Sequence, residues 1–117
     1  MSPERAEWME EISTFAAAEG LTGREVVLYG DIPALSFYLQ MPPAFNSWPD
    51  LDSYSLQAMQ EDMQELREEV ENGKELPVVI VGKSYEQGDK LALIKEFMEE
   101  YTYHLVFEND RFILWKP

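Results

Sequence analysis

Residues 56–82 read LQAMQEDMQELREEVENGKELPVVIVG, and they carry the two patterns that decide the fold. In the first half, apolar residues recur at steps of three and four, as on the buried stripe of an amphipathic helix; they are Leu56, Met59, Met63, Leu66 and Val70. Asn72-Gly73 ends this helix. Pro77 to Val81 is then a continuous apolar run closed by Gly82, which is typical of a strand buried on both faces.

The same alternation continues toward the N-terminus. A helix is expected from Ser2-Pro3-Glu4, where Ser is the cap and Pro takes the first helical position, to a stop at Gly20. A second buried strand is expected at Val26-Val27-Leu28-Tyr29. Asp31 can cap the next helix, which ends at Pro42-Pro43. Two helices and a strand are therefore expected before residue 56.

Toward the C-terminus, the sequence predicts one more helix and a hairpin. The helix carries its apolar stripe between Leu91 and Tyr101, and the hairpin joins residues 104–107 to 112–115 through a polar turn. The order α-β-α-α-β-α-β-β predicts an α/β fold of three layers, α/β/α. We expect a small, mainly parallel sheet of about four strands, with an antiparallel C-terminal hairpin and the last strand at one edge.

Length and composition limit the range of functions. At 117 residues, of which 45% are hydrophobic, the chain fits one soluble α/β domain that spans residues 1–117. The 23 acidic residues outnumber nine Lys and Arg, and the net charge of −14 disfavours nucleic acid and anionic lipid as partners. No apolar run is long enough to insert into a membrane, and Cys is absent, so thiolate chemistry is excluded.

Two motifs resemble ligand-binding signatures. Gly82-Lys83-Ser84 resembles the end of a phosphate-binding loop, but Pro77 occupies the position of the required first Gly, and residues 78–81 fit a strand. A turn off that strand is the better interpretation of Gly82. Asp50-Leu51-Asp52 has the spacing with which some sugar transferases hold a metal, yet two carboxylates rarely suffice for a hard cation. A turn or cap ahead of the helix at residue 56 is favoured there.

Two regions are candidate ligand sites. Ligands of open α/β sheets bind outside the carboxyl ends of the strands, where Gly30, Asp31, Ser84 and Tyr85 are expected; for Asp31 a helix cap is the favoured alternative. The second region is the long loop over residues 41–54, whose aromatic residues include Phe45, Trp48 and Tyr54. Aromatic faces stack on sugars or lipids, although covering one end of the sheet is the favoured role of this loop.

Catalytic machinery is not expected. His104 is the only histidine, it lies in an expected strand, and no Ser-His-acid spacing accompanies it, so neither a triad nor a zinc site is supported. We expect His104 to be packed or to face the edge of the sheet. The acidic residues Glu61 to Glu71, answered only by Arg67, fit a solvated helix face. We therefore predict no catalytic residue, no bound metal and no cofactor.

A longer stretch carries a family resemblance. VVLYGDIPALSFYL at residues 26–39 runs on to Pro42-Pro43-Ala44-Phe45 and to WPDLDSY at residues 48–54. With the apolar run at residues 77–81 and the closing hairpin, this resembles the C-terminal soluble domain of polytopic glycosyltransferases of the protein-mannosyltransferase-like, lipid-sugar-using superfamily. The likeness covers about residues 24–117.

The resemblance implies a fragment of a larger membrane protein. In that family the catalytic acid lies in an extracytoplasmic loop near the N-terminus, so none of its residues transfers to this chain. The implied function is a non-catalytic extracytoplasmic accessory domain that binds an acceptor or a partner, such as lipid-linked sugar or the membrane portion of its own chain. Two alternatives remain: a free-standing flavodoxin-like module for a small ligand, and an acidic protein-interaction domain.

Overall fold

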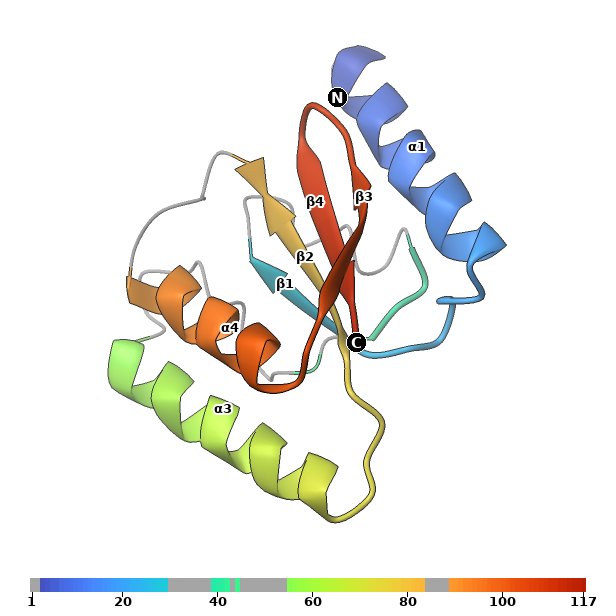
Figure 1. Ribbon diagram of the computed structural model, residues 1–117. Coiled ribbons are helices and arrows are strands. Elements are labelled where there is room, and N and C mark those ends of the chain that lie inside the picture. Colours follow the sequence, from blue (N-terminus) through green and yellow to red (C-terminus); the bar gives the residue numbers. More distant parts are fainter. Residues whose placement is uncertain (1–2, 30–38, 43, 45–54, 84–88) are drawn as a thin grey trace.

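The computed structural model describes residues 3–29, 39–42, 44, 55–83 and 89–117 (Figure 1). Its elements follow the expected alternation: α1 (Pro3–Ala18), β1 (Val26–Tyr29), α3 (Leu56–Glu71), β2 (Val78–Gly82), α4 (Asp89–Glu100), β3 (His104–Glu108) and β4 (Phe112–Lys116). The helix expected between Asp31 and Pro42-Pro43 lies mostly outside the described residues. The described part of the chain is a small α/β domain.

The four strands form one mixed sheet in the order β1-β2-β4-β3. β1 and β2 are parallel, with Tyr29 opposite Val81, whereas β4 is antiparallel to both β2 and β3. The expectation of a mainly parallel sheet is therefore wrong, because one of the three described pairings is parallel.

β4, the last strand of the chain, lies inside the sheet and not at its edge. Residues Phe112, Ile113 and Leu114 are buried, while β3 is exposed along most of its length. The hairpin therefore places its second strand against β2 and leaves its first strand outside. The sequence pattern could not separate these two placements, because both strands of the hairpin have apolar residues.

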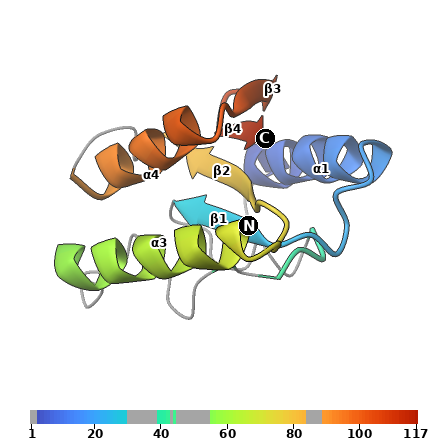
Figure 2. The ribbon, with the colours of Figure 1, turned by 60° about the horizontal axis from the view of Figure 1, so that its bottom comes forward.

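Apolar clusters cover the two faces of the sheet. One joins α1 to Val26, Leu28, Val78, Ile80, Phe112 and Leu114; the other joins α3 and α4 to Val27, Tyr29, Val79 and Val81. Figures 1 and 2 show α1 on one side of the strands and the two other labelled helices on the opposite side. Alternation along β1 and β2 thus directs successive side chains into different clusters.

Helix α3 begins and ends as its sequence dictates. The Ser55 Oγ accepts a hydrogen bond from the backbone N–H of Ala58 at 3.1 Å, so Ser55 is the N-cap. Gly73 follows the C-cap with φ of +105°, a conformation that Gly adopts without strain. A capping role for Asp50 or Asp52 is thus not needed at this helix, and both residues lie outside the described residues.

A β-bulge interrupts β3 between Leu105 and Phe107. Leu105 is opposite Trp115, and Phe107 is opposite Leu114, so these two residues of β3 pair with residues that face different sides of β4. Without the bulge, Leu105 and Phe107 would share a face. The bulge therefore lets Phe107 join the cluster under α1 while Leu105 faces the side of α4.

Candidate functional site

The predicted site residues Gly30, Asp31, Phe45, Trp48, Tyr54, Ser84 and Tyr85 all lie outside the described residues. The strands that precede two of these predicted positions are described. β1 ends at Tyr29, just before Gly30, and β2 ends at Gly82, two residues before Ser84, and the two strands are paired in parallel. The two carboxyl ends are therefore adjacent, as the sequence predicted. Gly82 is the last residue of β2 and pairs with Phe112, so the strand extends one residue beyond the expected run that ends at Val81.

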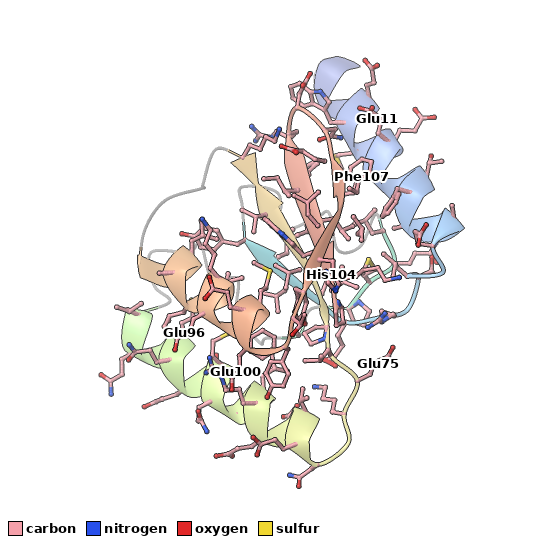
Figure 3. All side chains as sticks on the ribbon, viewed as in Figure 1. Glu11, Glu75, Glu96, Glu100, His104 and Phe107 are labelled. Carbon is pink, nitrogen blue, oxygen red and sulfur yellow. The ribbon has the colours of Figure 1, made fainter. Side chains whose placement is uncertain are left out.

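Within the described part of the chain, two surface hollows flank the hairpin. One is a groove of about 510 Å³ between α1 and β3, lined by Glu7, Glu10, Glu11, Thr14, Phe15, Ala18 and Phe107. Its floor is aromatic, since the rings of Phe15 and Phe107 have centroids 4.9 Å apart. Figure 3 shows Phe107 on β3 facing α1, the helix that carries Glu11. We call this feature the α1–β3 groove.

The rim of the α1–β3 groove is negatively charged. Glu10 and Glu11 are exposed, as is Glu7, and no Lys or Arg among the described side chains forms an ion pair with any of the three. An apolar floor with an acidic rim is complementary to a segment that combines apolar and cationic side chains. It does not suit an anion or a purely hydrophobic surface.

At the open edge of the sheet, β3 presents apolar side chains to solvent. Leu105 is 52% exposed and Val106 is 37% exposed, the large hydrophobic side chains that stand out among the described residues. His104, at the start of this edge strand, is also exposed, so of its two expected placements, packed or facing the edge, the structure shows the second. A charged ion pair, Lys83 Nζ with Glu108 Oε2 at 2.8 Å, closes the far end of the strand.

The second hollow lies on the other side of the hairpin and measures about 450 Å³. It is lined by Lys95, Met98, Glu99, Thr102, Tyr103 and Trp115. Trp115 and Tyr103 are half-buried members of the cluster under α3 and α4. We call this feature the α4–β4 hollow.

Tyr103 is fixed in the wall of this hollow. Its hydroxyl donates a hydrogen bond to the carbonyl oxygen of Pro77 at 2.5 Å, and its ring centroid is 5.8 Å from that of Phe97. Burial raises the pKa of the Tyr103 hydroxyl far above its usual value; the nearby Arg24 acts in the opposite direction. The hydroxyl therefore remains a neutral donor at physiological pH.

Other charged groups are structural. Lys74 Nζ contacts Glu69 Oε2 at 2.6 Å and Glu25 Oε2 at 3.0 Å, which ties the end of α3 to the start of β1. The hydrogen bond with Glu69 is the largest cause of a raised Lys74 pKa. Arg24 donates to the Leu76 carbonyl oxygen at 2.6 Å. These pairs bring the starts of β1 and β2 together.

The expected role of Arg67 on the acidic face of α3 is wrong. Arg67 does not answer the acids of its own helix; its Nε lies 2.7 Å from Glu100 Oε2 on α4, and its guanidinium lies 5.7 Å from the centre of the Phe97 ring. Glu61, Glu65 and Glu68 are exposed, as the prediction of a solvated face requires. Arg67 is therefore a clamp between α3 and α4.

The described residues contain no group of three or more His, Cys, Asp or Glu side chains placed to hold a metal ion. Among the same residues, no helix has the length and apolar character needed to cross a membrane. Comparisons with protein-family models, with curated proteins and with solved structures found no match. The family resemblance therefore rests on the sequence motifs at residues 24–117.

Sequence reasoning missed both hollows. Each combines a helix with a strand of the hairpin, and the residues that meet are up to about a hundred positions apart, for example Phe15 with Phe107. Periodicity identifies the elements but not the edge at which they meet.

Proposed function

We propose that this chain is a non-catalytic binding domain that docks a partner segment in the α1–β3 groove. The carrying observation is the aromatic floor of the groove, formed by Phe15 and Phe107, beneath its rim of exposed Glu residues. Exposed apolar surface next to a polar rim marks interaction sites on proteins. The occupant is a protein segment with apolar and cationic side chains.

A second copy of the chain fits this surface less well. Each copy carries a net charge of −14, so two copies repel each other at the distances from which association begins. The bulge in β3 also breaks the regular edge that strand-to-strand pairing uses. A cationic partner avoids both penalties.

We further propose that the domain is an extracytoplasmic accessory part of a membrane glycosyltransferase and that the cationic segment belongs to the membrane portion of its own chain. Support comes from the resemblance over residues 24–117. On this view the domain has a three-layer α/β/α architecture with the hairpin at one edge, which the two apolar clusters support. Acceptor or lipid-linked sugar would meet the enzyme close to the docked domain.

The acidic face of α3 is the second candidate surface. Glu61, Glu65 and Glu68 are exposed, and no ion pair joins them to any described cation. This face lacks an apolar floor, so it would bind a cationic partner through screened charges alone. For that reason the α1–β3 groove is preferred.

Site-specific crosslinking within the complete reading frame tests this function. A photoreactive amino acid in place of Thr14 should crosslink to membrane-spanning segments of the same chain, and the same change at Gln64 on α3 is the control. A frame without encoded membrane spans would overturn the glycosyltransferase assignment. Crosslinks at Gln64 but not at Thr14 would overturn the groove and favour the α3 surface.

A further inference from the structure

The α4–β4 hollow contains an unpaired cation in a chain that is rich in acids. The other described Lys and Arg side chains all have an interaction: Arg24, Arg67, Lys74, Lys83 and Lys116 form ion pairs, and Lys90 and Arg111 also have partners. Among the described residues Lys95 is the exception, and it lines the hollow. Its ammonium group is therefore available to a ligand.

Glu99 lines the same hollow one helical turn further along α4. Residues four apart on a helix are neighbours and often form an ion pair. Here no Lys95–Glu99 pair forms within 4.0 Å, and no described cation pairs with Glu99. The hollow therefore offers one free donor and one free acceptor, whose charges cancel.

Thr102 supplies a hydroxyl at a position where a β-branched residue is strained. Its φ is +56°, in the left-handed region that β-branched residues rarely adopt. The corresponding positions after α1 and α3 are Gly20 and Gly73, with φ of +71° and +105°. The turn after α4 thus contains Thr102, a residue that is less favourable than Gly at a positive φ but that lines the hollow.

The fourth component is a rigid aromatic wall. Trp115 is held within the sheet, opposite Val79 on β2 and Leu105 on β3, and the hydrogen bond to Pro77 holds Tyr103 in place. An aromatic face of this kind accepts an apolar ring face, while polar groups around it fix orientation. The volume of about 450 Å³ is within the range of small-molecule sites.

We infer that the α4–β4 hollow binds the ring of a neutral sugar. Sugar hydroxyls both donate and accept hydrogen bonds, which matches a Lys donor, a Glu acceptor and a Thr hydroxyl that does either. The less polar face of a pyranose ring matches the Trp115 wall. A phosphate or another anion fits poorly, because Glu99 lies in the hollow and the chain is strongly negative.

This inference stands on residues of the face opposite the α1–β3 groove, and it does not rest on the proposed function. It is tested by titrating the ¹⁵N-labelled domain with the methyl glycosides of neutral hexopyranoses, and with glucuronic acid and methyl phosphate as charged probes. The indole N–H of Trp115 should shift with at least one neutral glycoside. The indole of Trp8, in the cluster under α1, is the internal reference and should not move.

Variants on the exposed face of α4 give the decisive comparison. Glu99→Gln should weaken binding of that glycoside about tenfold, the loss of one charged hydrogen bond, whereas Glu96→Gln, the same change outside the hollow, should leave it unaltered. Neither position is buried, so both variants should fold. Absence of a Trp115 shift with every neutral glycoside, a shift with the charged probes alone, or equal effects of the two variants would each overturn the inference.

Discussion

Phe15 of α1 and Phe107 of β3 lie with their ring centroids 4.9 Å apart and their planes inclined by 31°. A second contact reinforces this one, since the Asn109 side-chain amide donates to the Trp8 carbonyl oxygen at 3.3 Å. Together they join the N-terminal helix to the C-terminal hairpin. The α1–β3 groove is thus formed by elements from the two ends of the described chain.

Phe107→Ala should lower the free energy of unfolding by about 2 kcal/mol, because it deletes a half-buried aromatic side chain from the cluster under α1. The matched control is Leu105→Ala, two residues away on the same strand, which is 52% exposed. That variant should change stability by less than about 0.5 kcal/mol. Urea unfolding measures both changes. Equal losses would show that the bulge does not separate the two side chains.

Leu66→Ala and Ile80→Ala should each lower the free energy of unfolding by about 2–5 kcal/mol. Leu66 is 3% exposed in the cluster under α3 and α4, and Ile80 is fully buried in the cluster under α1, so the two variants probe different faces of the sheet. Gln64→Ala, on the exposed face of α3, is the control. A loss below roughly 1 kcal/mol for Ile80→Ala would contradict a central position for β2.

Thr102→Gly should stabilise the fold by about 1 kcal/mol, because Gly adopts a positive φ without the steric cost that a β-branched residue has. The same substitution removes a hydroxyl from the α4–β4 hollow, so sugar binding should weaken as stability rises. Thermal unfolding and the glycoside titration measure the two effects. A lower melting temperature would mean that the Thr102 side chain stabilises the turn.

Alkaline pH should destabilise the fold partly through Tyr103. Its pKa is raised above the usual 10.0, mainly by burial, so the folded state favours the neutral hydroxyl. This contribution to stability is complete below pH 10 and is lost as the pH rises from there toward the folded-state pKa. Lys74, whose pKa is also raised, loses its contribution in the same direction above 10.5.

Tyr103→Phe separates the two groups. It should cost about 1 kcal/mol at neutral pH, through the lost hydrogen bond to Pro77, and should flatten the decline of stability above pH 10. The remaining decline then belongs to Lys74 and other groups. Tyr101→Phe is the control for the loss at neutral pH, since the Tyr101 hydroxyl is not involved in this bond; because burial also raises the pKa of Tyr101, part of the remaining alkaline decline belongs to that residue. An unchanged decline in Tyr103→Phe would exclude Tyr103 as its source.

Much of the fold could be predicted from local patterns. The stripe from Leu56 to Val70 and the apolar runs at residues 26–29 and 77–81 identify elements that the structure confirms, because their periodicity reflects burial on known faces. Gly20 and Gly73 mark two helix ends correctly. These features depend only on residues close together in sequence.

Long-range arrangement could not be predicted in the same way. Which strand of the hairpin contacts β2 depends on pairing between Gly82 and Phe112, and nothing local to either residue specifies it. No sequence pattern predicts the bulge at Val106 either, because residues 104–107 have the composition of a regular strand. The two hollows follow from those choices. The predicted site residues at Gly30, Asp31 and the aromatic loop stay predictions.

The central claim is that the α1–β3 groove binds a cationic, apolar segment, and chemical-shift mapping tests it most directly. The ¹⁵N-labelled domain is titrated with a synthetic amphipathic helix of Lys and Leu residues, and two variants of identical charge change are compared. One replaces Glu7, Glu10 and Glu11 with Gln at the groove; the other replaces Glu61, Glu65 and Glu68 with Gln on α3.

We expect the amide shifts to cluster on residues 7–18 and 104–108, and binding to weaken about tenfold or more in the groove variant but not in the α3 variant. Because the rim is exposed, added salt should weaken binding without moving the shifts elsewhere. Shifts centred on α3 would contradict the claim. Equal weakening in the two variants would also contradict it, because the peptide would then bind through the net negative charge of the chain and not through the groove.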